Sequence, residues 1–316
     1  MTNTKGSGLG DDLWFGGYHI GGDTQAYNIA SPTGVQDVTD ITQSAHSRLL
    51  LTRDGSIDWT SYFDKAAGAA HAALSPQGAA DDIITVLCGG HAIGGEAACL
   101  NAKQLNYDPS RSATGELTIK VQGQGNGFGL EWCKQLTAGL RTDTTGTNGA
   151  TFDTAGGATT PAVPATTVAA ANPSSTLATV VVTGGTVTNV AVNGVSVGTG
   201  DGTYTVPPGG TIALTYSVAP TWTWTWQTLF GAQAYLQATA LTGSTATVTV
   251  QHSPDNATWT TLATFAAVTS APQAQRVTVS NTTTVQRYLR AITTGTFTGF
   301  AFQAAINVNL VAGQVF

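Results

Sequence analysis

The chain has 316 residues, of which 41% are hydrophobic and only 9% are charged, and its net charge is −6. This hydrophobic content is too high for intrinsic disorder, and the lack of charge-patterned Leu, Glu and Lys repeats excludes a long coiled coil. The acidic balance, with no basic run, argues against tight binding to a nucleic-acid backbone. So few charges also predict that much of the surface is buried against other copies of the chain.

The first part of the chain, residues 1–155, has a mixed pattern. Residues 49–59 read LLLTRDGSIDW and predict two short strands around the turn sequence RDG. Residues 61–74 are rich in alanine, with apolar residues about one turn apart, and predict a helix. Residues 115–124 alternate between apolar and polar and predict a strand. We therefore expect residues 1–155 to form a β domain with one helix near 61–74.

Three cysteines, Cys88, Cys99 and Cys133, all lie in this first part. Their spacing fits no metal site, and their odd number favours reduced, buried thiols in a protein that folds in a cytoplasm. The beginning of the sequence has no signal-peptide pattern, and no apolar run is long enough for a membrane span. We expect no membrane association.

The remainder of the chain divides into three segments. Residues 156–176, rich in Pro, Ala and Thr, predict a linker. Residues 177–222 contain short β-branched runs separated by Gly-Gly, Asn-Gly and Asp-Gly, and predict a small immunoglobulin-like β-sandwich. Residues 223–316 predict further strands, with turns at 241–244 and 253–256. This last unit either completes the fold of the first part or duplicates it.

Few residues of the sequence are candidates for a catalytic, metal-binding or phosphate-binding role. His19 and His91 lie in similar glycine-flanked segments, GGYHIGGD and GGHAIGGE, which we interpret as flexible loops rather than metal or phosphate ligands. The pairs Asp11-Asp12 and Asp81-Asp82 could supply the carboxylates of a glycosidase, but turn solvation explains them better. Nucleophile and metalloprotease motifs are absent from the sequence. We therefore expect no enzymatic activity, no cofactor and no metal.

One aromatic row requires its own interpretation. Trp222, Trp224 and Trp226 alternate with threonines, so a strand would place all three indoles on one face. Such a face could stack on a sugar ring as a glycan platform. The interpretation that we favour is that the indoles cover the seam between the small sandwich and the main body.

Two stretches resemble a known family. Residues 41–64, ITQSAHSRLLLTRDGSIDWTSYFD, and the Ala-rich segment that follows resemble the strand, hairpin and helix of major tail tube proteins from long-tailed (siphovirus-type) bacteriophages. Residues 251–260, QHSPDNATWT, with QRYLRA at 286–291 and GTF at 295–297, are similar to the C-terminal strands of phage tail and virion proteins.

The resemblance implies a mainly β fold: a tail-tube-type β-sandwich or barrel with one flanking helix, present once or twice in the chain, and an immunoglobulin-like decoration domain. It implies a homo-oligomer of trimeric or hexameric stacked rings, which form a conduit for DNA during ejection without binding it tightly. The implied partners are other tail proteins, namely the tape measure, tail terminator and tip. The implied location is the virion tail, assembled in the host cytoplasm.

Two other interpretations stay open at this point. The chain could be a carbohydrate-binding or adhesin module that uses the tryptophan row, or a phage capsid or decoration protein. Tubes, shells and monomers distinguish these interpretations in electron micrographs.

Overall fold

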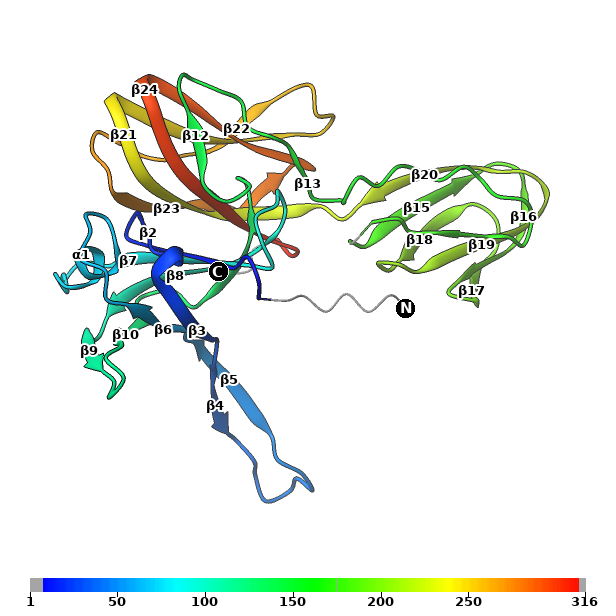
Figure 1. The fold of residues 1–316 in the computed structure, drawn as a ribbon. Helices are drawn as coiled ribbons and strands as arrows, with labels where there is room; N and C mark the ends of the chain where they lie inside the picture. Colours follow the sequence, from blue (N-terminus) through cyan, green and yellow to red (C-terminus); the bar gives the residue numbers. More distant parts are fainter. Residues whose placement is uncertain (1–7, 175, 313–316) are drawn as a thin grey trace.

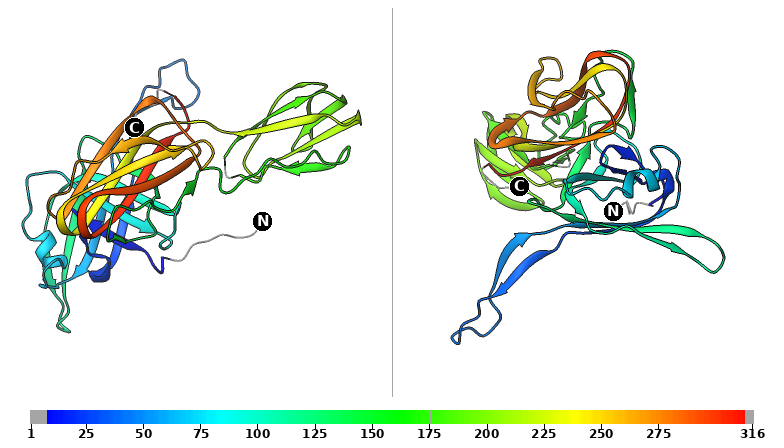
Figure 2. Two further views of the ribbon diagram at one scale, coloured as in Figure 1. Left: turned by 90° about the horizontal axis from the view of Figure 1, so that it is seen from above. Right: turned by 90° about the vertical axis from the view of Figure 1, so that its left-hand side faces the viewer.

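The computed structural model describes residues 8–174 and 176–312. Figure 1 shows a body of two packed β units, a small sandwich that projects from one side of the body, and a long hairpin, β4–β5, that projects from another. The right-hand view of Figure 2 shows the same hairpin directed away from the body. The prediction of a mainly β fold with one helix is confirmed.

The first unit is built from short strands around one 3-10 turn and one helix. These elements are β1 (Asp12–Phe15), β2 (Tyr18–His19), η1 (Gly21–Asp23), β3 (Thr24–Ala30), β4 (Thr33–Asp37), β5 (Arg48–Arg53), β6 (Ser56–Tyr62), α1 (Ala70–Leu74), β7 (Asp82–Cys88), β8 (Glu96–Gln104), β9 (Asp108–Arg111), β10 (Leu117–Gly125), β11 (Glu131–Gln135), β12 (Arg141–Asp143) and β13 (Phe152–Asp153).

Strand β6 shows why these segments form strands and not helices. Ile57, Trp59 and Ser61 alternate inward along it, while the residues between them are more exposed. The strand pairs with β10 as far as Tyr62, so the predicted helix over 61–74 is wrong in its first half. Gly68 adopts a φ of 82° that a helix does not accept, and only the five residues of α1 are helical.

The second unit is dominated by two very long strands. They are β21 (Leu229–Ser253) and β24 (Tyr288–Asn309), and β22 (Thr260–Thr264) and β23 (Gln273–Val285) flank them. The predicted turn at 241–244 is wrong, because β21 continues through it and stays paired with β24. Gly243 and Gly295 have φ values of 148° and 134° at irregularities of this pairing, where a side chain would collide with the opposite backbone. The glycines therefore bend the ribbon instead of ending it.

One sheet joins the two units. Its main path runs β2-β1-β7-β8-β11-β24-β21-β22, so β11 and β24 connect the first part of the chain to the last. The first unit has a core around Ile57, Trp59 and Ile84, and the second has a core around Phe300 and Phe302. A third cluster, which includes Trp14, Cys133 and Tyr235, draws residues from both units. The two units thus share buried contacts as well as backbone pairing.

The projecting sandwich, called the insert below, has two antiparallel sheets. One sheet has the order β14-β19-β16-β17 and the other β18-β15-β20. The strands are β14 (Ala169–Ala171), β15 (Ala178–Thr183), β16 (Thr186–Val192), β17 (Val195–Gly198), β18 (Gly202–Val206), β19 (Thr211–Val218) and β20 (Thr221–Trp226). The Asn-Gly turn lies where it was expected, with Asn193 and Gly194 at φ values of 50° and 80°.

The boundaries of the insert are wider than the sequence pattern indicated. Strand β14 lies inside the predicted linker 156–176 because Ala169–Ala171 pairs with β19. At the other end β20 pairs with β15 as far as Trp226, four residues beyond the predicted end at 222. Strand β14 was missed because the Pro-, Ala- and Thr-rich composition of this segment resembles that of a linker. The last strand of the insert, β20, extends further along the chain than predicted.

Arg287 fastens both connections of the insert to the body. Its guanidinium donates to the two carboxylate oxygens of Asp153 at 2.8 and 2.7 Å and to the carbonyl of Ala158 at 2.6 Å. The same guanidinium lies 4.7 Å from the ring centre of Trp226. Asp153 and Ala158 belong to the entering segment and Trp226 to the leaving strand, so one side chain holds both.

Replacing Arg287 by alanine is therefore expected to loosen the insert while the body stays folded. The lost charge-assisted hydrogen bonds are worth roughly 1–3 kcal/mol, which corresponds to a rise of about 5- to 150-fold in proteolysis of the 156–168 segment. Limited proteolysis followed by mass spectrometry measures this rise. Arg290→Ala is the matched control, because Arg290 stacks 4.0 Å over Trp259 and contacts neither connection. Equal cleavage in both variants would contradict the role of Arg287.

Candidate assembly interface

The hairpin β4–β5 is a two-stranded sheet of its own and pairs with no other strand of residues 8–174 and 176–312. All eleven residues of its strands are exposed. It leaves the body through two short connections, residues 31–32 after β3 and 54–55 before β6. The expected strands within 49–59 are present, but they do not pair with each other, because β5 pairs with β4 and β6 pairs with β3 and β10.

The hairpin is apolar although it is surrounded by solvent. Leu50, which is 69% exposed, lies opposite Val35, and these two side chains share one face. Leu49 and Leu51 point to the other face because successive side chains of a strand alternate. At the tip Ile41 is also exposed. Both faces of the hairpin therefore present branched aliphatic side chains.

Polar contacts hold the tip of the hairpin in shape. The Asp37 carboxylate accepts hydrogen bonds from the Thr39 amide at 2.9 Å and the Thr39 hydroxyl at 2.5 Å, and it lies 3.0 Å from His46. Asp40 accepts the corresponding pair from Thr42. Hydrogen bonds from the Thr39 hydroxyl and amide lower the pKa of Asp37 below its ordinary value. The loop is thus ordered locally while its strands remain uncovered.

An isolated two-stranded hairpin is marginally stable in water. Burying one Leu or Val side chain contributes about 1.5–3 kcal/mol, and this hairpin buries none of its aliphatic side chains within the described chain. A surface of this kind is a typical protein–protein contact, and leaving it free would expose an aggregation-prone strand edge. The hairpin is the strongest candidate for a functional site.

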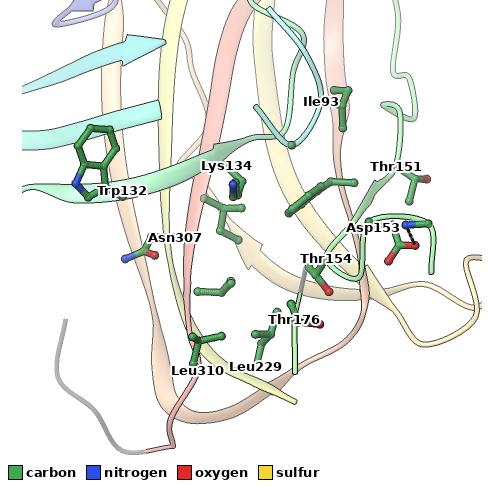
Figure 3. A pocket seen from close by; sticks show the side chains of 16 residues that line it. Ile93, Trp132, Lys134, Thr151, Asp153, Thr154, Thr176, Leu229, Asn307 and Leu310 are labelled. Carbon is green, nitrogen blue, oxygen red and sulfur yellow. Dashed lines mark hydrogen bonds between the residues drawn. The ribbon is translucent and has the colours of Figure 1, made fainter. Parts of the chain in front are cut away.

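A second exposed apolar feature lies on the body. We call it the Trp132 ridge and define it by Phe128, Trp132, Leu310 and Val311. In β11 the side chains of Glu131 and Cys133 are buried, so the alternation turns the indole of Trp132 outward, where it is 53% exposed. Two cavities of about 720 and 780 Å³ share Trp132 and Leu310 in their walls. Figure 3 shows the first of them, with Trp132 at one end and Leu310 at another.

The tryptophan row does not form an exposed platform. Trp222 and Trp224 belong to the core of the insert, and Trp224 is only 3% exposed. The Trp222 indole donates to the carbonyl of Pro161 at 2.8 Å. Both interpretations of the row are therefore wrong for these two residues, because a sugar-stacking ring must be accessible and because these indoles fill the core of the insert itself instead of covering its seam with the body. Trp226 lies at the junction with the body, under Arg287.

The two glycine-flanked histidines are brought together by the fold. The Nε2 atoms of His19 and His91 lie 2.8 and 3.1 Å from oxygens of the Asp12 carboxylate, which is buried. His19 also stacks on Trp14, with 4.5 Å between ring centres. The two segments are thus anchored through one carboxylate, and the interpretation as flexible loops missed this contact because His19 and His91 are far apart in the sequence.

Asp81 of the second acidic pair binds Lys103 at 2.7 Å and accepts hydrogen bonds from Asn101 and Asn126. Within residues 8–174 and 176–312 no group of three His, Cys, Asp or Glu side chains has an arrangement that could hold a metal ion. No helix in the same residues has the length and apolarity needed to cross a membrane.

The sequence matches no family model and no curated protein. Among solved structures, one similar chain comes from the tail of an empty GTA particle with C6 symmetry, with 19% identity and a TM-score of 0.29 over 35% of this chain and 81% of that one. Another is SPP1 Dit, described as a hub of the adsorption apparatus in phages that infect Gram-positive hosts, with 9% identity and a TM-score of 0.27 over 95% and 99% of the two chains. Both TM-scores are too low to establish a common fold, so the functional argument rests on the surfaces of the chain itself.

Proposed function

We propose that this chain is a structural protein of a bacteriophage tail that assembles with copies of itself into stacked rings and so forms the tail tube. The observation that carries the proposal is the hairpin β4–β5, whose strands are fully exposed and apolar on both faces. A hairpin with one apolar face could lie flat on a single neighbour. A hairpin with two apolar faces is covered only when it lies between two surfaces, as in a stack of rings.

The sheet topology supports repeated head-to-tail contacts. The main sheet ends in β2 on one side and in β22 on the other, and these ends are different surfaces. Contacts between unlike surfaces generate rings when the rotation closes and filaments when it does not. Either a trimer or a hexamer would satisfy this geometry, and a tube is a stack of such rings.

The charge distribution suits a channel for DNA. Five of the twelve Lys and Arg side chains, Lys103, Lys134, Arg141, Arg276 and Arg287, each form an ion pair with a carboxylate. With a net charge of −6 the protein would repel the phosphate backbone more than it attracts it. DNA could then pass through the lumen during ejection without binding tightly, and no enzymatic step is part of this proposal.

Electron microscopy of the concentrated, purified protein tests the proposal. Hollow tubes of stacked rings are the expected result, and their symmetry would distinguish trimers from hexamers. Closed shells would favour a capsid or decoration protein, and monomers at high concentration would contradict self-assembly. Co-purification with tape-measure, terminator or tip proteins from virions would test the expected partners and the location in the tail.

A further inference from the structure

We propose that the Trp132 ridge is the surface on which the β4–β5 hairpin of a second copy docks. This inference rests on the proposed function, and it adds the acceptor surface to the donor hairpin. Hairpin and ridge each expose several large aliphatic or aromatic side chains. A head-to-tail assembly needs one surface of each kind on every copy.

The hairpin of the same copy is directed away from the ridge. The larger cavity beside Trp132 is lined by Thr33, Thr52 and Arg53, which form the base of the hairpin. From this base β4 and β5 extend outward from β3 and β6 through connections of only two residues each. Figures 1 and 2 show the hairpin pointing away from the body. Such short connections leave no slack for Leu49 to Leu51 to turn back, so the occupant comes from another copy.

The ridge fits the hairpin in shape. Trp132 borders two hollows, and their walls include Ile93, Leu229 and Ile306 on one side and Leu130 on the other. Leu49 and Leu51 lie on one face of β5, about 7 Å apart, which is the spacing of alternate residues in a strand. Two leucines at this spacing can enter the hollows on either side of one indole.

The charges around the ridge are also compatible with an apolar hairpin as its partner. The carboxylates nearest the ridge are already paired, since Glu131 binds Arg276 at 3.0 Å beneath it and Glu96 binds Lys134 at its rim. Arg53, at the base of the same copy's hairpin, is a further charged residue in the wall of the larger cavity. An aliphatic hairpin that covers the ridge therefore meets no unpaired carboxylate. The two arginines of β5, Arg48 and Arg53, lie at the ends of the strand and would remain at the edge of the contact.

Cross-linking between copies tests the docking. In a Cys88→Ser background, which leaves only the buried Cys99 and Cys133, one preparation carries Leu49→Cys and a second carries Leu310→Cys. The two are mixed, assembled and treated with a short bis-maleimide. We expect a cross-linked dimer whose mass spectrum joins residues 49 and 310, because Leu49 lies on the face that docks on the ridge. A mixture of Leu49→Cys with Leu105→Cys is the control, because Leu105 is similarly exposed and follows the end of β8 that is remote from β11.

The outcomes separate this inference from the proposed function. If tubes form but cross-linking does not exceed that of the control mixture, the docking site is wrong and the proposed function is unaffected. Cross-linking of a Leu49→Cys/Leu310→Cys double variant in dilute monomer would show that a copy covers its own ridge, which also overturns the docking site. If no assembly forms at all, the proposed function and the docking site both fail.

Substitution of the ridge provides a second readout. Trp132→Ser is expected to raise the concentration needed for assembly at least tenfold without lowering the thermal stability of the monomer, because the indole is half-exposed there. Leu140→Ser, at another exposed apolar position, should leave assembly unchanged. Equal effects of the two substitutions would contradict a specific role for the ridge.

Discussion

A Leu49→Glu/Leu51→Glu variant is expected to fold as a monomer and to form neither rings nor tubes. Both side chains lie on one exposed face of β5, and the substitutions would carry two carboxylates into the proposed contact, where two leucines would otherwise be buried. Losing two buried leucines costs about 3–6 kcal/mol per contact, and enclosing unpaired charges costs several kcal/mol more. Self-association should therefore weaken by a factor of about 10³ or more, as light scattering coupled to gel filtration would measure.

The opposite face gives an independent comparison. Leu50→Glu alters only the face that contains Val35, so it should disturb one of the two contacts of the hairpin and leave the other intact. Single rings that do not stack, or short open chains, are the expected products in micrographs. Leu105→Glu is the control for an added surface charge outside the hairpin. Normal tubes from the Leu49→Glu/Leu51→Glu variant would show that the hairpin is not an assembly contact.

The stability of the monomer should not change in these hairpin variants. The strands β4 and β5 bury no residue in the body, and their only ladder is the one between them. Circular dichroism and thermal unfolding should match those of the parent protein. A large loss of stability would mean that the hairpin packs on the body in solution.

Strand content and the Asn-Gly turn were readable from the sequence because they are local properties, whereas the turn predicted at 241–244 was overruled by long-range pairing with β24. The Asn193-Gly194 turn and the alternation in β6 and β10 are fixed by backbone sterics and by one buried face. The helix over 61–74 was overestimated for the same reason. Alanine spacing is a local signal, whereas the pairing of Ser61 and Tyr62 with β10 is a long-range contact that outweighs it.

Features that depend on distant residues escaped the sequence analysis. The stretch Leu49-Leu50-Leu51 was read as a strand, but its exposure arises because β5 pairs only with β4 among the described strands and the hairpin projects from the body, which no local pattern encodes. The tryptophan row was read correctly as a strand face, but the sequence could not indicate whether that face meets solvent or the opposite sheet of the insert. Asp12 could not be linked to His19 and His91 before the fold placed them together.

Arg276→Met is expected to destabilise the body by about 3–5 kcal/mol at neutral pH. Arg276 on β23 binds Glu131 on β11 at 3.0 Å and donates to the Tyr235 hydroxyl at 3.0 Å, and the Tyr235 hydroxyl donates to Glu131. Arg276 and Glu131 are only 8% and 6% exposed, and they join the first unit to the second. Without the guanidinium, Glu131 is left as a buried charge without a counterion. Chemical denaturation would measure the loss.

The pH dependence of this loss follows from the direction of one pKa shift. Burial raises the pKa of Glu131 above its usual 4.5, although Arg276 and Tyr235 act against the rise. A carboxyl whose pKa is higher in the folded state contributes most to stability at low pH, and its contribution falls as the pH rises through that pKa. Removing Arg276 raises the pKa further, so the deficit should be smallest near pH 4.5 and should grow as the pH rises from there.

A double variant separates the buried charge from the lost packing. Arg276→Met/Glu131→Gln removes both charges and keeps an acceptor for the Tyr235 hydroxyl, so it should recover most of the stability lost by Arg276→Met and should lose the added pH dependence. Recovery would mean that the pair is needed because each partner neutralises the other in the shared core. A double variant as unstable as the single one would instead assign the effect to the packing of Arg276 on the Phe128 ring, 3.6 Å from its guanidinium carbon. Because Phe128 is also part of the Trp132 ridge, that result would predict weaker assembly as well as weaker folding.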